Sequence, residues 1–322
     1  MKKLKNIILA FCIALPVCAG NVKNSPVSQN GHLRVNGTQL CNEKGEPIAL
    51  HGTSFGWHNL WPRFYNKQAV SWLVKDWNVN VVRAAMGLEI EDNYRDNPEF
   101  AKKCIDQVVD GAIKEGIYVI IDFHAHHNYK EAAVDFFTEM AKKYGKYPNV
   151  IYEIWNEPLE IEWSEVKGYA EEVMKAIRVI DPDNIILVGC PRWDQDIDKV
   201  ADDPIKGATN VMYTMHFYAA THAKWLRDRT DYALNKGVPV FVSECAGMEA
   251  TGDGVLDETA WNIYVDWMKE RKLSWIAWSV SDKNETCSML IPRASSYGNW
   301  TSDVIKPWGK IARESIRKAN AN

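Results

Sequence analysis

The sequence predicts an α/β protein folded as a (β/α)8 barrel, the TIM-barrel architecture, with a short β-hairpin at its N-terminal end. Three observations favour this fold: eight apolar runs of strand length recur along the chain, segments of helical period separate them, and the alternation extends over about 280 residues. A doubly wound open sheet is the alternative. It is disfavoured because no run is followed by the glycine-rich phosphate loop of that fold.

The predicted strands are short runs rich in apolar and β-branched residues. They cover residues 48–55, 79–86, 118–124, 150–157, 184–190, 211–218, 238–244 and 274–281. Such runs are typical of parallel strands that are buried on both faces. Before them, Leu33 and Val35 lead into Asn36-Gly37, the favoured two-residue turn of a β-hairpin.

Helices are predicted between the runs because the hydrophobic period changes from two to about 3.6. The apolar stripes are Val70, Leu73, Val74 and Trp77, then Val166, Tyr169, Val173 and Ile177, and then Trp261, Tyr264, Val265 and Met268. A last helix, predicted roughly over residues 304–318, closes the ring of helices.

The first 20 residues are predicted to be a signal peptide. Three lysines within the first five residues precede an apolar stretch too short to span a bilayer, and Val17-Cys18-Ala19-Gly20 resembles a cleavage site. The chain thus divides into a signal peptide (1–20), a polar tail (21–30) and a barrel domain (31–322). We expect a secreted or periplasmic protein; lipoprotein attachment at Cys18 is the alternative, which Pro16 and Val17 disfavour.

The composition limits the class of protein. The 322 residues are 46% hydrophobic and can bury a full core, while a net charge of −4 without a dense basic run disfavours a nucleic-acid partner. Five cysteines follow the signal peptide without CxxC spacing, which disfavours a zinc site and a disulfide framework but leaves one disulfide bond open. We expect a monomer that needs no cofactor and does not span a membrane.

Two glutamates at predicted strand ends are the strongest functional signal. The run at 150–157 ends in Asn156-Glu157 before Pro158, and the run at 238–244 ends in Glu244. The C-terminal ends of the strands of a parallel barrel meet at one face, so the two carboxyl groups are expected to lie close together. Glycoside hydrolysis uses such a pair, one protonated to assist the leaving oxygen and the other ionised to attack the sugar.

Polar and aromatic residues also mark the other strand ends. They are Trp57, His58 and Trp61 after the first run, Arg83 in the second, His124, His126 and His127 at the third, Trp193 after the fifth, His216 and Tyr218 in the sixth, and Trp278 and Asp282 at the eighth. The spacing of His124 and His126 also fits a zinc hydrolase, but the other strands do not supply the remaining ligands. We therefore expect no metal ion.

From about Leu33 onward the chain resembles glycoside hydrolase family 5, the retaining β-glycanases best known as endo-β-1,4-glucanases (cellulases). The matching segments are Val81-Val82-Arg83, Ile121-Asp122-Phe123-His124, Ile154-Trp155-Asn156-Glu157-Pro158, His216-Phe217-Tyr218, Phe241-Val242-Ser243-Glu244 and Trp275-Ile276-Ala277-Trp278. Asn-Glu-Pro is the most specific of these. One departure is Cys245-Ala246-Gly247-Met248, where many members have Tyr or Trp followed by Gly.

The resemblance implies roles for the residues nearest the reaction. Glu157 would be the general acid/base and Glu244 the nucleophile, and Asn156 would bind the 2-hydroxyl of the sugar under attack. Arg83 and Tyr218 would hold the nucleophile. We expect the Arg83 cation to keep Glu244 ionised, and the pKa of Glu157, which has an aromatic neighbour at position 155, to be raised.

Supporting roles are implied for five further residues. His124 and His216 would order the site, and Trp278 would form the floor of the subsite beside the cleaved bond. Trp61 and Trp193 are candidate sugar platforms, with core packing as the alternative for each.

Several other polar residues are interpreted as structural. Glu153 is expected to face inward together with Trp155 and Glu157, on the period of two, and to be a buried, hydrogen-bonded carboxylate deeper in the barrel. The glutamates beyond the strand ends are interpreted as solvated loop charges; they are Glu89, Glu91, Glu160 and Glu162. His58, His127 and His222 are interpreted as packing or surface residues.

Together these features predict a secreted endo-β-1,4-glucanase that acts on a polysaccharide partner, a β-1,4-glucan, by a two-step retaining mechanism. A β-mannanase or a mixed-linkage glucanase of the same fold is the alternative. A non-catalytic carbohydrate-binding barrel is a further alternative, which the intact glutamate pair disfavours. Endo action is expected because no long insertion in the loops after the strands could roof the cleft.

Overall fold

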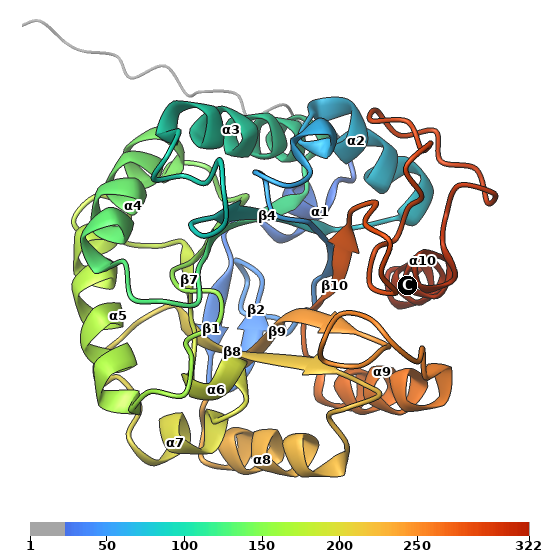
Figure 1. Cartoon of the computed structure of the whole chain (residues 1–322). Helices are drawn as coiled ribbons and strands as arrows, with labels where there is room; N and C mark the ends of the chain where they lie inside the picture. Colours follow the sequence, from blue (N-terminus) through green and yellow to red (C-terminus); the bar gives the residue numbers. More distant parts are fainter. Residues whose placement is uncertain (1–22, 322) are drawn as a thin grey trace, which may run out of the picture.

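In the computed structural model, which describes residues 23–321, eight parallel strands close into a barrel inside a ring of helices (Figure 1). The strands are β3 (His51–Phe55), β4 (Val81–Gly87), β5 (Tyr118–His124), β6 (Val150–Glu153), β7 (Ile185–Val188), β8 (Val211–Tyr218), β9 (Val240–Ala246) and β10 (Trp275–Val280). Each pairs with its neighbours in chain order, and β10 closes the ring against β3. The predicted (β/α)8 fold is confirmed.

Helices follow the strands around the outside of the barrel (Figure 1). They are α2 (Lys67–Trp72), which continues into a π-helical turn at Leu73–Trp77, α3 (Pro98–Glu115), α4 (Lys130–Tyr144), α5 (Trp163–Arg178), α6 (Pro191–Asp194), α7 (Ile197–Asp202), α8 (Lys224–Asn235), α9 (Glu258–Arg271) and α10 (Pro307–Ala319). A 3-10 turn at Pro62–Phe64 precedes α2. The predicted last helix is α10, which begins at Pro307 because proline suits the first helical position.

The N-terminal segment covers the end of the barrel opposite the predicted site. β1 (Arg34–Asn36) and β2 (Gln39–Cys41) form the predicted antiparallel hairpin. Part of the predicted polar tail is helical, because α1 (Pro26–Asn30) follows a Ser25 side chain that accepts from the N–H of Ser28. The predicted signal peptide and Cys18 lie outside the described residues.

The inward-facing side chains of the barrel form layers, because every second residue of a strand points inside. An apolar layer fills the end near the hairpin; it comprises Val81, Tyr118, Ile120, Ile151, Ile185, Leu187, Met212, Phe241 and Ile276 together with Leu33, Leu40 and Leu50. Two residues further along five of these strands, the inward positions are Arg83, Asp122, Glu153, Thr214 and Ser243, all buried. This polar layer is the base on which the predicted site lies.

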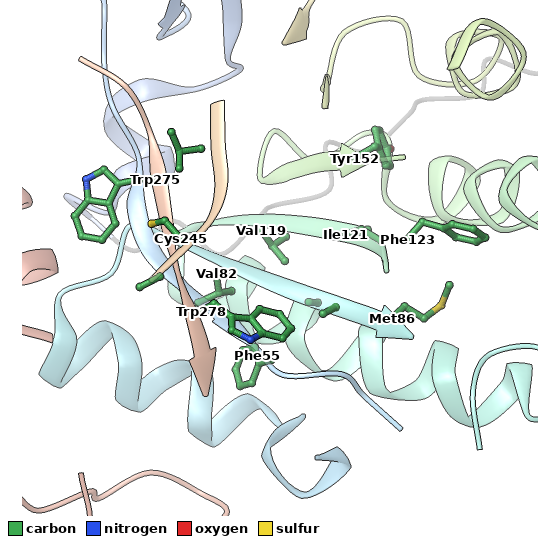
Figure 2. Close-up of a cluster of buried hydrophobic side chains, with 14 of the residues drawn as sticks. Phe55, Val82, Met86, Val119, Ile121, Phe123, Tyr152, Cys245, Trp275 and Trp278 are labelled. Carbon is green, nitrogen blue, oxygen red and sulfur yellow. The ribbon is translucent and has the colours of Figure 1, made fainter. Parts of the chain in front are cut away.

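A second apolar core lies between the strands and the helices. Outward-facing side chains of neighbouring strands gather there, and Figure 2 shows Val82, Ile121, Phe123 and Tyr152 among them. The Phe123 ring lies 5.9 Å, centroid to centroid, from two phenylalanines of α4. Burial on both faces explains why the strands appear in the sequence as continuous apolar runs.

Two expectations, one about disulfide bonds and one about membrane-spanning helices, can be compared with the structure of residues 23–321. The five cysteines of this part of the chain are free buried thiols, so the disulfide bond left open by the sequence is not formed there. No helix in the same range combines the length and the apolar character needed to cross a bilayer.

Candidate active site

Glu157 lies four residues beyond the end of β6. The predicted strand over 150–157 is therefore too long, since β6 ends at Glu153. The backbone nevertheless stays against β5, because the N–H of Asn156 donates to the carbonyl of Phe123 at 3.1 Å and the N–H of Glu157 to that of Ala125 at 3.2 Å. These two bonds place the Glu157 side chain over the open end of the barrel.

The inward alternation predicted for residues 153, 155 and 157 is wrong at Trp155. Its ring packs against Tyr169 of α5, with ring centroids 4.5 Å apart, on the helix side of the barrel wall. The alternation fails because the strand geometry ends at Glu153. Trp155 therefore belongs to the outer core and does not flank the carboxylate of Glu157.

Glu157 and Glu244 face each other across the open end of the barrel. One carboxylate oxygen of each lies within 4.8 Å of the other, and a ring nitrogen of His216 lies within the same distance of both. These three ligand atoms could also bind one metal cation. Each already has hydrogen-bonding partners in the protein, as described below, and these account for the arrangement.

Arg83 joins the polar layer to Glu244. Its Nε donates to Glu153 at 2.6 Å and its Nη1 to Glu244 at 3.1 Å, while Nη2 donates to Asn156 at 2.6 Å and lies 3.0 Å from Asp122. The guanidinium has no solvent exposure. Glu153 is thus the buried, hydrogen-bonded carboxylate that the sequence predicts. The single positive charge of Arg83 lies among three buried carboxyl groups. Because one charge cannot balance three carboxylates, further protons must be bound on these groups or on their neighbours.

Two donors hold the carboxylate of Glu244. Arg83 contacts Oε2, and the hydroxyl of Tyr218 donates to Oε1 at 2.8 Å. Burial raises the pKa of Glu244, and the charge of Glu157 raises it further, while the charges of His216 and Arg83 lower it. The two donors also orient the carboxylate toward the open end of the barrel.

Glu157 is held by two imidazoles. Nδ1 of His216 lies 2.9 Å from its Oε1, and Nε2 of His126 lies 3.5 Å from its Oε2. Burial alone would raise the pKa of Glu157, but the hydrogen bonds and charges of the two histidines outweigh burial and lower the pKa to about 2. The raised pKa expected from an aromatic neighbour is therefore wrong for the ligand-free site.

His216 is fixed on its other side by Ser243 and Asp194. Its Nε2 lies 2.8 Å from the Ser243 hydroxyl and 3.2 Å from Oδ2 of Asp194, a carboxyl group buried in the barrel wall. Burial lowers the pKa of His216, but the charge of Asp194 and the hydrogen bonds to Glu153 and Glu157 raise it well above the usual value. Burial in turn raises the pKa of Asp194 to about 8.

His124 and Trp278 form one wall of the site. Their rings are stacked, with centroids 5.2 Å apart and planes 6° from parallel. Nδ1 of His124 lies 2.7 Å from Oδ2 of Asp122, while burial and the charge of Arg83 lower the pKa of His124 well below its usual value. Burial also raises the pKa of Asp122 well above its usual value, so this contact holds one hydrogen between the imidazole and the carboxyl group. Figure 2 shows the Trp278 indole, which is carried by β10.

The sequence profile of the family described as Cellulase (glycosyl hydrolase family 5) matches residues 41–284, which include every residue of this arrangement. The chain belongs to glycosyl hydrolase family 5. The fold, the paired glutamates and the profile thus agree on one family.

Named relatives and solved structures resemble this family 5 chain over most of its length. Endoglucanase A of Evansella cellulosilytica is 43% identical over 99% of this chain, which spans 67% of that protein. A solved structure from Cytophaga hutchinsonii has a TM-score of 0.90 at 41% identity, covering 92% of this chain and 98% of that one. The catalytic domain of a Thermobifida fusca endoglucanase, in complex with cellotetraose, has a TM-score of 0.86 at 34% identity, covering 91% and 99%.

The three candidate sugar platforms of this family 5 barrel differ in exposure. Trp278 is 8% exposed and Trp193 is 37% exposed. Trp61 is partly buried against the outer core and packs so closely over Gly56 that an added Cβ would lie 2.6 Å from its ring. Asn156 offers an unused donor beside them, because its buried Nδ2 has no hydrogen-bond partner among the described residues.

Sequence reasoning missed the partners of the two histidines that hold Glu157. The interpretation of Glu89 as a solvated loop charge is wrong, because its side chain is 17% exposed and hydrogen-bonds to both His126 and His127. Asp194 is absent from the predicted site residues, and neither residue lies on a strand. A weak signal existed only for Asp194, since it directly follows Trp193 after the fifth predicted strand.

Proposed function

We propose that this chain is an endo-β-1,4-glucanase that hydrolyses cellulose-type β-glucans with retention of configuration. Its class, a glycoside hydrolase of the endoglucanase type, follows from its family and from its near full-length likeness to named endoglucanases. The close approach of Glu157 and Glu244, in which one carboxylate oxygen of each lies within 4.8 Å of the other, carries the proposal. Retaining enzymes need about 5–5.5 Å, whereas inverting enzymes need about 6.5–9.5 Å to admit a water.

In the first step a carboxylate oxygen of Glu244 attacks the anomeric carbon of the sugar. The bond from that carbon to the glycosidic oxygen breaks, and Glu157 transfers a proton to the departing oxygen, so a glycosyl ester forms on Glu244. Arg83 and Tyr218 hold the attacking carboxylate in place. Asn156, whose buried Nδ2 has no hydrogen-bond partner among the described residues, donates to the hydroxyl on the neighbouring carbon in this proposal.

In the second step water replaces the departed chain. Glu157, now ionised, removes a proton from the water as its oxygen attacks the anomeric carbon, and the ester bond to Glu244 breaks. Glu157 is thereby protonated again and Glu244 is ionised again, so the site returns to its starting state. Configuration is retained because two inversions occur in sequence.

The glucan assignment is supported by the aromatic surfaces and by the relatives. The Trp278 and Trp193 indoles can each lie against the flat CH faces of a β-1,4-linked glucose chain. The Thermobifida fusca relative has been solved with cellotetraose, a β-glucan fragment. Mannan differs at an axial hydroxyl, and a polar partner such as Asn156 would distinguish the two sugars.

A substrate panel tests this function. The wild-type protein is incubated with carboxymethylcellulose, mixed-linkage glucan, glucomannan and pure mannan, and products are scored by chain length, with Glu244→Gln as the inactive control. We expect oligosaccharides from carboxymethylcellulose as early products. Faster turnover of mannan or of mixed-linkage glucan would replace the glucanase assignment by the corresponding alternative. Binding without release of reducing ends would indicate a carbohydrate-binding barrel.

We also propose that the mature protein is a secreted or periplasmic monomer. The basic and apolar pattern of residues 1–20 supports export. N-terminal sequencing of the exported protein should begin close to residue 21, and light scattering should give the mass of one chain. A lipid-modified cysteine at the N-terminus would instead support attachment at Cys18.

A further inference from the structure

Five side chains form a continuous line across the open end of the barrel, with Glu157 at its centre. On one side, His216 bridges Glu157 and Asp194, with contacts of 2.9 and 3.2 Å. On the other, His126 bridges Glu157 and Glu89, with contacts of 3.5 and 2.8 Å. Each carboxylate oxygen of Glu157 thus faces an imidazole that is itself held by a second carboxyl group.

The outer half of this line is built around Glu89, in the loop after β4. Oε1 of Glu89 accepts from the backbone N–H groups of His126 and His127, at 3.0 Å each. Nδ1 of His126 lies 2.8 Å from Oε2 of Glu89, and Nδ1 of His127 lies 2.8 Å from Oε1. Four contacts to one carboxylate fix the loop after β5 and the direction of both rings.

The contact to Glu89 determines which nitrogen of His126 carries hydrogen. An ionised carboxylate only accepts, so Nδ1 of His126 must be the donor. Its Nε2 therefore faces Oε2 of Glu157 in one of two roles. Without a hydrogen, Nε2 accepts a hydrogen bond from a protonated Glu157; with a hydrogen, Nε2 donates one to an ionised Glu157. In both cases the pair holds one proton between them.

We propose that Glu89 and His126 are positioning residues for the acid/base, in which Glu89 fixes the His126 ring and His126 holds Oε2 of Glu157 and shares its proton. This inference rests on the proposed function of Glu157. It extends that function, because it assigns the acid strength of Glu157 to two loop residues, Glu89 and His126, which are distinct from the strand residues below Glu157.

The charges around His126 give the sign of the effect. Glu89 and Glu157 face it with negative charge, the His127 ring contacts the other oxygen of Glu89, and the His124 ring lies 6.5 Å away, centroid to centroid. Because His126 and Glu157 share one proton, the basic limb of the kcat/KM profile reports the loss of that shared proton. With His126 in place the negative charges of Glu89 and Glu157 keep the proton bound to high pH. Without the imidazole Glu157 alone holds it, so the basic limb should move downward.

The test compares two neighbouring histidines that contact the same carboxylate. The pH profile of kcat/KM is measured on soluble β-glucan for the wild type, His126→Gln, Glu89→Gln and His127→Gln. We expect the basic limb to fall by at least about one pH unit in His126→Gln and to move in the same direction in Glu89→Gln, with no shift in His127→Gln. On an aryl cellobioside with an activated leaving group, whose departure needs no proton, the rate of the first step should fall less in His126→Gln than it does on β-glucan.

Each other result overturns the inference. A uniform loss of kcat/KM with an unmoved limb would show that His126 acts only in loop structure, and an equal shift in His127→Gln would show an unspecific effect of the loop. If His126→Gln does not fold, Glu89→Gln decides, because it leaves the imidazole in place. A wild-type protein that cleaves no β-glucan overturns the proposed function as well, whereas an active wild type with unmoved limbs overturns this inference alone.

Discussion

Arg83 donates a hydrogen bond from Nη1 to Oε2 of Glu244 at 3.1 Å although its own guanidinium is fully buried. The same group binds Glu153 in the layer below and Asn156 beside Glu157. The planar fork of arginine is what allows one cation to orient residues from β6, from the segment that follows β6 and from β9. Arg83 therefore couples the stability of the barrel interior to the geometry of the site.

Arg83→Lys should reduce both activity and stability. A lysine ammonium keeps one charge but cannot bind Glu153 and Glu244 with fixed geometry, so buried carboxylates lose a partner, which costs about 3–5 kcal/mol. We expect kcat/KM to fall at least about 100-fold, the equivalent of two misplaced hydrogen bonds of about 1.4 kcal/mol each. Chemical denaturation and steady-state kinetics measure the two effects. Arg293→Lys, at an exposed ion pair with Asp303, is the control and should match the wild type.

The activities of variants at Glu157 and Glu244 should depend differently on the leaving group of the substrate. Glu244→Gln removes the nucleophile and should abolish turnover of every substrate, because no glycosyl ester can form. Glu157→Ala should spare the first step for aryl glycosides whose leaving groups need no protonation, while polysaccharide cleavage is lost. Burst kinetics with an activated aryl cellobioside measure that step. Equal losses in both variants on activated and unactivated substrates would contradict the assigned roles.

The strand residues of the site are predictable from sequence because a strand has a fixed period. Once Val81 is assigned to the interior, Arg83 must follow it, and the same reasoning places Glu153 above Ile151. Glu244 breaks this period, because it directly follows the inward Ser243. The pairing of β9 with both neighbouring strands shifts in register at this point, and such an irregularity turns Glu244 to the inside. Parallel strands also share one direction, so these residues are bound to converge on one face.

Loop residues escape this reasoning because no period relates them. Glu89 follows β4 by two residues, and only the fold of two separate loops brings it to His126. Asp194 lies in a turn where three successive residues, Arg192 to Asp194, have left-handed backbone conformation, which is rare away from glycine and has no sequence signature here. The lowered pKa of Glu157 follows from these missed neighbours, so it could not be predicted either.

His58 should make the protein less stable in mild acid. Its side chain is fully buried, its Nδ1 accepts from the N–H of Gly87 at 3.0 Å, and burial lowers its pKa from 6.5 to about 4. Above pH 6.5 both folded and unfolded states hold it neutral, so it has no effect there. As the pH falls from 6.5 to about 4 the unfolded state gains the proton first, and up to about 3 kcal/mol of stability is lost.

Urea denaturation at pH 7.5 and at pH 4.5 measures this loss. His58→Asn keeps a hydrogen-bond acceptor but cannot titrate, so its stability should fall less between the two pH values than that of the wild type. His127→Asn is the matched control, since His127 is 64% exposed, and it should follow the wild type. Identical pH dependence in His58→Asn and the wild type would show that other groups govern acid unfolding.

Trp193 should contribute to polysaccharide binding more than to folding. Its indole is 37% exposed, and its backbone is held by the left-handed turn and by an N–H bond to the carbonyl of Pro158 at 2.8 Å, next to Glu157. Trp193→Ala should therefore leave the midpoint of thermal unfolding nearly unchanged. Loss of one stacked sugar, about 1–1.5 kcal/mol, should raise KM for soluble β-glucan about fivefold to tenfold.

The matched control for Trp193 is Tyr232→Ala. Tyr232 is similarly exposed, at 39%, but it lies near the end of α8, the helix end that leads into β9 at the opposite face of the barrel. Its removal should not change KM on any substrate. An aryl cellobioside, which is shorter than a polysaccharide segment, should lose less affinity in Trp193→Ala than the soluble glucan does. An unchanged KM for the glucan in Trp193→Ala would assign the indole to the packing of its own turn, because an exposed ring that stacks on sugar must weaken binding when it is removed.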